Sequence, residues 1–238
     1  ELFGGNVNLK HIVSYRAWDD DFDTDNGFSG KVQFAVALRD PNIADQSGSN
    51  GFESDNDGQG TTATPYTSAV FSNISVFGPQ ADASTTINSQ FRRAAHLRRN
   101  TRLKIYNSIF CGFPTGLLID GSLCETNAAN NDLQFRNNLI AGCATPLAVN
   151  SGSTFDLTTC KSIIHLTFPL RISYRQLILR CWQAHRSTIL TWPALSRLIT
   201  AELSELLTGH RDGATGILKT LTINSVSAFH SNRFNWAG

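Results

Sequence analysis

The chain of 238 residues lacks several features that mark common protein classes. It has no methionine, no Cys-x-x-Cys pair and no apolar run long enough to cross a membrane. It also has no Gly-x-Ser-x-Gly, His-Glu-x-x-His, P-loop or Rossmann motif, and its six histidines are scattered. The sequence therefore offers no motif of a known catalytic class. The missing initiator methionine predicts a piece of a longer protein, and the five cysteines, which lack metal-ligand spacing, predict free thiols.

Charge is low overall but unevenly distributed. The formal net charge is +1, yet residues 1–60 hold 11 Asp and Glu against 4 Lys and Arg, and residues 161–238 hold 3 against 9. A basic cluster, FRRAAHLRRNTRLK, occupies residues 91–104. Because it lacks interleaved aromatics and any nucleic-acid-binding motif, we expect no nucleic-acid partner. A solvated face, a partner for the acidic segment and an anionic-glycan site remain as interpretations of this cluster.

A thirty-residue repeat runs through the first two thirds of the chain. The segment FDTDN at residues 22–26 returns as FESDN at 52–56. The segment NSIFCG at 107–112 returns as NNLIAG at 137–142, and a looser copy, NISVFG, begins at Asn73. Self-similarity at a fixed period of about 20–50 residues indicates a solenoid, a propeller or an array.

The local pattern within each copy indicates strands. Apolar residues alternate at Val32, Phe34 and Val36 and again at Leu103 and Ile105, and a period of two is typical of a strand. Asn, Asp and Gly punctuate these segments as in turns. We therefore predict an all-β fold, a parallel β-helix solenoid over residues 1–160 that lacks its N-terminal coils. A β-sandwich is the main alternative, but it does not explain why the same residues return in register.

The repeated acids are predicted to form a ladder on the outside of this solenoid. If residues 18–25 form one strand, Trp18 and Phe22 share the inner face. The opposite face then carries four carboxylates, those of Asp19, Asp21, Asp23 and Asp25. In the second copy Glu53, Asp55 and Asp57 face outward. Stacked coils place Asp23 over Glu53 and Asp25 over Asp55.

Such a ladder needs something to offset its like charges, which destabilise neighbouring strands when they lie opposite each other. Ca²⁺ accepts about six to eight oxygen ligands in flexible geometry, so we predict a Ca²⁺ site assembled across coils from these seven carboxylates. A solvated acidic ridge, screened by water and salt, is the alternative. Asn26 and Asn56 are expected to stack at a bend with their amides bonded to each other.

Three stretches carry a family resemblance. They are residues 3–57, from FGGNVNLK to FESDND; residues 64–79, TPYTSAVFSNISVFGP; and residues 98–121, RRNTRLKIYNSIFCGFPTGLLIDG. Together they resemble a family of secreted, surface-associated, pectin-lyase-like β-helix proteins of Bacteroidota, over about residues 1–150. The resemblance implies a right-handed solenoid and an extracellular or cell-surface location. It implies no settled activity.

The resemblance ends near Cys160, where Asp and Gly become scarce and the repeat disappears. Residues 161–238 are therefore predicted to form a separate, atypical tail that is irregular or partly helical. A genuine capping segment is one interpretation, because apolar residues recur at helical spacing between Pro193 and Gly209. A frame-shifted translation is the other, and sequencing the coding DNA decides between them.

Two functions follow from these observations. The first is a Ca²⁺-stabilised surface protein that binds glycans or has a structural role. The second is a Ca²⁺-dependent, pectate-type polysaccharide lyase, which needs a cation on the substrate carboxylate and a Lys or Arg base. Lys31 and Lys10 are the candidate bases, and Arg39 and Arg16 the candidate groups for binding the carboxylate. A polysaccharide is the expected partner, and nothing in the sequence indicates an oligomeric state.

Overall fold

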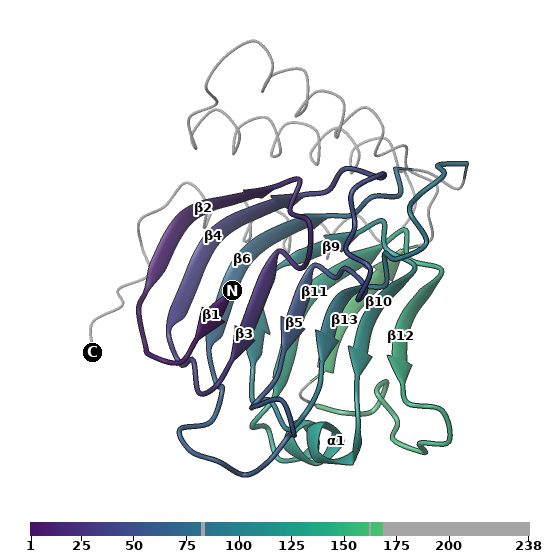
Figure 1. Ribbon diagram of the computed structural model, residues 1–238. Helices are drawn as coiled ribbons and strands as arrows, with labels where there is room; N and C mark the ends of the chain where they lie inside the picture. The colour runs from purple at the N-terminus through teal and green to yellow at the C-terminus, as the bar shows by residue number, and fades with distance from the viewer. Residues whose placement is uncertain (82–83, 162, 169–238) are drawn as a thin grey trace. The chain divides into compact units, whose positions relative to one another are not determined.

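The computed structural model describes residues 1–81, 84–161 and 163–168, all within one compact unit, Glu1–Arg171. These residues form two parallel sheets and one short helix (Figure 1). Sheet A contains β1 (Leu2–Phe3), β3 (Phe22–Asp25), β5 (Phe52–Ser54), β7 (Arg93–Leu97), β10 (Thr115–Ile119) and β12 (Thr145–Val149). Sheet B contains β2 (Leu9–Tyr15), β4 (Lys31–Leu38), β6 (Val70–Phe77), β8 (Lys104–Tyr106), β9 (Ile109–Cys111), β11 (Gln134–Ala141) and β13 (Ile163–Phe168). The helix α1 (Ser122–Ala129) lies between β10 and β11 in the chain.

The strands alternate between the two sheets as the chain advances, and every strand pair in the described residues is parallel. Each coil therefore adds one strand to sheet A and one strand to sheet B, and in one coil the sheet B strand is divided into β8 and β9. This is the arrangement of a β-helix, in which successive coils lie about 4.8 Å apart. It excludes the β-sandwich alternative, whose sheets are antiparallel.

The predicted repeat register is confirmed. Phe22 pairs with Phe52 and Thr24 with Ser54 between β3 and β5. Ile109, Phe110 and Cys111 pair with Leu139, Ile140 and Ala141 between β9 and β11. Residues thirty apart in the sequence thus lie side by side on neighbouring coils.

Stacked phenylalanines fill the space between the sheets. The rings of Phe22 and Phe71 pack around that of Phe52, whose centroid lies 4.9 Å from the centroid of Phe22 and 4.9 Å from that of Phe71. Phe110 continues the stack, 5.8 Å from Phe52 and 5.2 Å from Phe135. Burial of this apolar surface is the main stabilising contribution to the unit.

Each coil bends within sheet B at a residue with a left-handed backbone. Register places five residues with φ between 51° and 60° at this one position: His11, Phe34, Asn73, Asn107 and Asn137. Asparagine tolerates this conformation better than most residues with a side chain. The repeated Asn of the NISVFG, NSIFCG and NNLIAG segments is therefore selected by backbone geometry.

Two expectations need correction. The amides of Asn26 and Asn56 do not bond to each other, because Asn56 donates to the carbonyls of Thr61 and Ala63 and accepts from the backbone of Thr67. The coils also continue past the expected boundary at residue 160, since β13 pairs with β11 up to Phe168. The helix expected between residues 193 and 209 lies outside the described residues.

Candidate functional site

The repeated acids lie on the outer face of sheet A at the predicted pairing. Asp23 of β3 pairs with Glu53 of β5, which pairs with His96 of β7. The flanking Phe22 and Thr24 are buried, whereas Asp23 is partly exposed. One row of titratable side chains therefore crosses three coils.

Asp21 is an exception to the predicted ladder. Its carboxylate and the guanidinium of Arg39 are both fully buried, with Oδ2 and Nε 3.3 Å apart, and Ser14 donates a 2.6 Å hydrogen bond to Oδ1. Strand β3 begins only at Phe22, so strand alternation does not extend back over residues 18–21. Trp18, expected inside, is accordingly 64% exposed. The prediction of four outward carboxylates is wrong for Asp21.

Two arginines at the end of β7 neutralise the second acidic copy. Arg98 Nε donates to Asp55 Oδ1 at 2.7 Å, and Arg98 Nη2 donates both to Asp55 Oδ2 at 3.1 Å and to Glu53 Oε2. Arg99 Nη1 donates to Asp55 Oδ2 at 2.8 Å. Charge-assisted, forked bonds of this kind are among the stronger hydrogen bonds in proteins. The basic cluster is thus a partner for the acidic segment, one of its three predicted roles.

Three of the other predicted ligands, Asp19, Asp25 and Asp57, form no ion pair in the described residues, although Asp25 lies close enough to Asp55 for its charge to raise the pKa of Asp25 after burial. Asp57 closes its own turn by accepting from the backbone of Gln59 and Thr61. Asp25 accepts from the backbone of Asn26 at 2.6 Å, and Asp19 is exposed. Both carboxylates remain on the surface of the first acidic copy.

His96 joins the acidic row to the next coil. Its Nε2 lies 2.7 Å from Asp120 Oδ2, and its Nδ1 lies 3.5 Å from Glu53 Oε1. Asn150 Nδ2 donates to the other oxygen of Asp120 at 2.6 Å. The buried imidazole thus lies between two carboxylates, and Asp120 is held on both of its oxygens.

The environment shifts the pKa values of the carboxyl groups on this face in opposite directions. Burial, followed by the charge of Glu53, raises the pKa of Asp20 to about 8 and that of Asp23 to about 7. Burial also acts to raise the pKa of Glu53, but the bond from His96 and the charge of Arg98 lower it overall. At neutral pH the face therefore holds protonated and ionised carboxyl groups side by side.

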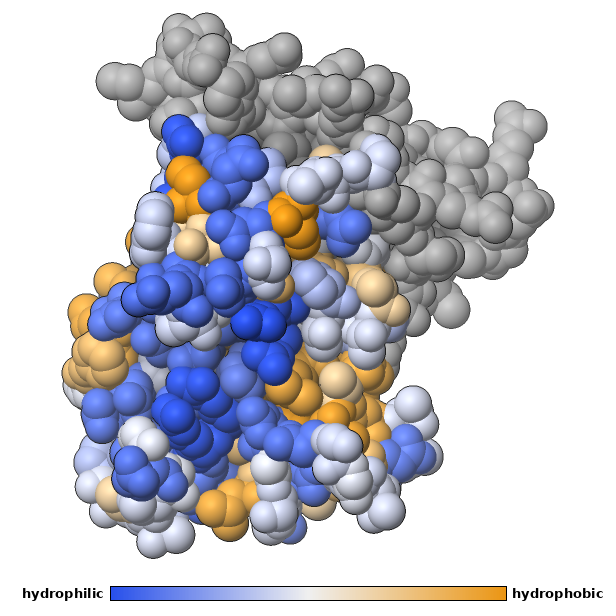
Figure 2. Space-filling view, turned by 45° about the vertical axis from the view of Figure 1, so that its right-hand side comes forward, coloured by the Kyte–Doolittle hydropathy of each residue, from blue (hydrophilic) through white to orange (hydrophobic). Residues whose placement is uncertain are grey.

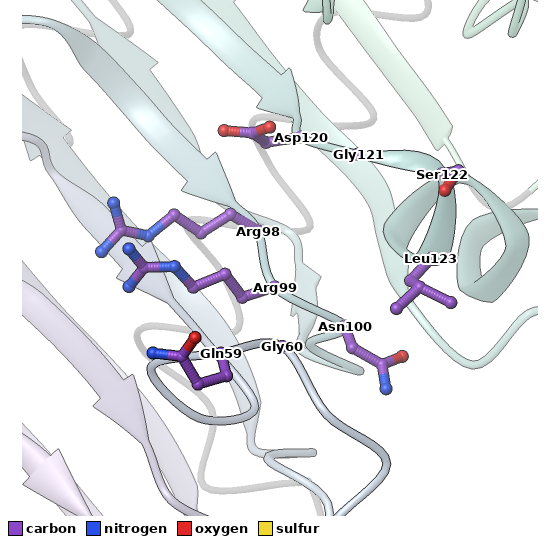
Figure 3. A pocket seen from close by; sticks show the side chains of 9 residues that line it. All are labelled: Gln59, Gly60, Arg98, Arg99, Asn100, Asp120, Gly121, Ser122 and Leu123. Atoms are coloured by element: carbon purple, nitrogen blue, oxygen red, sulfur yellow. The ribbon is translucent and has the colours of Figure 1, made fainter.

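Two hollows lie along this face. The first, which we call the Arg98 hollow, has a volume of about 340 Å³ and is lined by Gln59, Gly60, Arg98, Arg99, Asn100, Asp120, Gly121, Ser122 and Leu123. Figure 3 shows Arg98 and Arg99 extending in the same direction from the end of β7, with Ser122 and Leu123 at the start of α1. The second, the Arg93 hollow, has a volume of about 350 Å³ and is lined by Arg93, Thr115, Leu118, Asp120, Ala148, Val149, Asn150 and Ser151. Asp120 lines both hollows, which therefore lie next to each other on this face, and we refer to the two together as the groove.

The groove has both polar and apolar surface. Its arginines carry the positive charge, and Arg93 makes no hydrogen bond or ion pair through its guanidinium with any described residue. Leu123, 47% exposed, supplies apolar contact at the Arg98 end. Figure 2 shows strongly hydrophilic side chains gathered beside a hydrophobic area on one face of the described unit.

A comparison with protein families accounts for this architecture. The profile of the pectate-lyase like beta helix domain matches residues 1–165. The chain belongs to this family. No curated protein and no solved structure matches the chain significantly. Secretion and an origin in Bacteroidota stay predictions. Within the described part of this pectate-lyase-like domain, no helix is both long and apolar enough to cross a membrane.

The pectate-lyase-like domain does not assemble the seven predicted Ca²⁺ ligands into one site. No three His, Cys, Asp or Glu side chains of the described residues are placed to bind one ion together. Five of the seven carboxylates already have other partners, namely those of Asp21, Asp25, Glu53, Asp55 and Asp57. As arranged, these five do not fit a shared Ca²⁺ site. Ca²⁺ binding elsewhere on the acidic face stays a prediction.

The candidate catalytic residues are not brought to the groove. Lys10 and Lys31 lie on β2 and β4 of sheet B, whereas the groove lies on sheet A. Lys10 pairs with Gln33 and so does not lie beneath Lys31. Arg39 is buried against Asp21, and Arg16 pairs with Asp40 at 3.0 Å. None of these four residues lines the groove, and their catalytic roles stay predictions.

Sequence reasoning missed Asp120, which lines the groove, and His96, which lies against it, whereas Arg93 belongs to the basic cluster with an anionic-glycan interpretation. His96 pairs with Glu53 across a separation of forty-three residues. The thirty-residue spacing does identify Asp120, because Asn150 follows it at that distance and bonds to it. A search for polar pairs at the repeat spacing would have found Asp120, but not His96.

Proposed function

We propose that the pectate-lyase-like domain binds an acidic polysaccharide along the groove on the outer face of sheet A. The observation that carries the proposal is the shared lining of the two hollows by Asp120. The two neighbouring hollows are lined by three arginines, Arg93, Arg98 and Arg99. The family membership supports a carbohydrate-related role, and an extracellular location would suit such a ligand.

The charges suit an anionic ligand although many acids lie nearby. Glu53 and Asp55 are neutralised by Arg98 and Arg99, and Asp120 is bonded to His96. Arg93 has no such partner among the described residues. A guanidinium binds a carboxylate through two parallel hydrogen bonds, so a uronate group would find its strongest contact at Arg93.

Neutral groups of the Arg98 hollow suit the rest of a sugar chain. The amides of Gln59 and Asn100 and the hydroxyl of Ser122 offer donors and acceptors for sugar hydroxyls. The exposed side chain of Leu123 offers an apolar contact. A few placed polar groups beside apolar surface are typical of a ligand site.

Calorimetric titration with an oligogalacturonate tests the proposal, with a neutral oligosaccharide of equal length as ligand control. Arg93→Ala is expected to weaken binding by about tenfold or more, the loss of one charge-assisted contact. Arg92→Ala is the matched control, because Arg92 is exposed and bonds to Gln90. We expect it to change the affinity by less than about twofold. Equal losses in both variants, or equal binding of the neutral ligand, would contradict the proposal.

A second candidate function, β-elimination of a uronate polymer, is favoured by one observation. Burial, with the charge of Arg92, lowers the pKa of Arg93 below its usual value although Asp120 acts to raise it. An arginine with a lowered pKa is better suited to take the proton next to the substrate carboxylate. The carbon–oxygen bond to the departing sugar then breaks, a carbon–carbon double bond forms, and the departing oxygen takes up a proton.

The ultraviolet absorbance of the unsaturated product tests this reaction directly. We expect absorbance to rise with polygalacturonate as substrate and to stay flat with Arg93→Ala. A flat trace for the unaltered protein, under conditions in which calorimetry shows binding, would remove the lyase candidate and leave the binding proposal intact.

A further inference from the structure

The guanidinium group of Arg98 lies where a cation bridging Glu53 and Asp55 would lie. It donates to both oxygens of Asp55 and to Oε2 of Glu53. The side chains of Arg98, Glu53 and Asp55 are 24%, 17% and 7% exposed, so this contact is largely removed from solvent. One side chain therefore offsets the repulsion between the two carboxylates of this coil.

The fourth oxygen of the two carboxylates is also occupied, and one of the other three accepts a second hydrogen bond. Asp55 Oδ2 accepts a second bond, from Arg99. Glu53 Oε1 accepts from Asn50 Nδ2 at 3.3 Å and faces His96 Nδ1. A Ca²⁺ ion needs several oxygen ligands at about 2.3–2.6 Å, and it would have to displace Arg98 to obtain them.

Part of each guanidinium remains available to a ligand. Arg98 Nη1 has no partner among the described residues. Arg99 uses only Nη1 in the contacts described, and its side chain is 42% exposed. Both arginines line the same hollow (Figure 3). Asp55 holds the two groups side by side, so they are positioned before a ligand arrives.

We infer that Arg98 and Arg99 serve as a built-in substitute for a divalent cation and receive an anionic group of the ligand directly. Binding of an acidic polysaccharide in this groove is then independent of metal. The inference rests on the proposed function for the identity of the ligand. Its structural part, the replacement of a cation by Arg98, can be tested without any polysaccharide.

The first experiment compares thermal unfolding with excess EDTA and with excess Ca²⁺. We expect the same Tm for the unaltered protein in both. Arg98→Gln leaves Glu53 and Asp55 with one cationic partner, and Ca²⁺ is expected to raise the Tm of this variant. Arg92→Gln, the matched control, should stay insensitive to Ca²⁺. Stabilisation of the unaltered protein by Ca²⁺ comparable to that of Arg98→Gln, or the lack of any Ca²⁺ effect in Arg98→Gln, would overturn the inference.

The second experiment measures oligogalacturonate affinity under the same two conditions. We expect the affinity of the unaltered protein to agree within about twofold, and Arg99→Gln to weaken it by about tenfold. Arg99 is half-exposed, so this variant remains testable if Arg98→Gln does not fold. Binding that requires Ca²⁺ overturns the inference and leaves the proposed function standing. The lack of binding in both conditions refutes the proposed function, whereas the unfolding experiment still decides the role of Arg98.

Discussion

Replacement of Asp20 by asparagine should change the pH dependence of stability in a calculable way. Asp20 accepts a 2.5 Å hydrogen bond from the backbone of Asn50 and lies close to the charge of Glu53. Burial, then Glu53, raises its pKa from 3.8 to about 8. The folded protein therefore keeps a proton on Asp20 over a pH range in which the unfolded chain has lost it.

The sign of the effect follows from proton linkage. Because the folded pKa is raised, the stability that this proton contributes is present at low pH and is lost as the pH rises through the folded pKa. Where the folded state holds one extra proton, the free energy of unfolding falls by about 1.4 kcal/mol per pH unit. Between pH 5 and pH 7, Asp20 alone accounts for a fall of about 3 kcal/mol.

Asparagine imitates the protonated carboxyl group, and its amide oxygen can still accept the bond from Asn50. Asp20→Asn should therefore match the unaltered protein only below about pH 3.8, where the carboxyl group is protonated in both the folded and the unfolded state. Its advantage in the free energy of unfolding should grow by about 3 kcal/mol between pH 5 and pH 7, as measured by urea unfolding. Asp19→Asn is the control, since Asp19 is a neighbouring but exposed carboxylate. Parallel stability curves for Asp20→Asn and the unaltered protein would refute the reasoning.

Two further substitutions test the buried pair and the bend of the coils. Arg39→Met should lower the free energy of unfolding by about 3–5 kcal/mol, because Asp21 stays buried without its partner. The double variant Arg39→Met/Asp21→Asn should recover part of the loss in the same urea titration, and a loss equal to the sum of the single variants would contradict this. Asn107→Ala should cost about 1 kcal/mol, because alanine disfavours the φ of 51° found there. Asn107→Gly should be close to neutral, so equal losses for both would show that the side chain matters more than the backbone.

The coil register was open to prediction because neighbouring coils of equal length bring identical positions together. Phe22 and Phe52 lie thirty residues apart and pair in the structure, and so do Ile109 and Leu139. Turn residues strengthened the prediction, because Asn at the bend of a coil meets a backbone requirement. The family comparison agrees over residues 1–165.

The partners of the carboxylates in the acidic row could not be predicted from the thirty-residue spacing. Arg98 reaches Glu53 across forty-five residues and Asp55 across forty-three, because the connection from β5 through β6 to β7 is longer than one repeat. The sequence spacing that aligns the first two coils therefore fails at the third. Asp21 was misplaced for a local reason, since the strand begins one residue after it.

The repulsion between like charges in the acidic row is reduced in a different way on each of its two coils. On the first coil, burial beside Glu53 keeps Asp20 and Asp23 protonated toward neutral pH. On the second, Arg98 lies between Glu53 and Asp55 and pairs with both carboxylates. The first solution removes charge, whereas the second brings positive charge to the edge of a groove. Because Arg98 lines that groove, the stabilisation of the coil and the attraction of an anion depend on the same side chain.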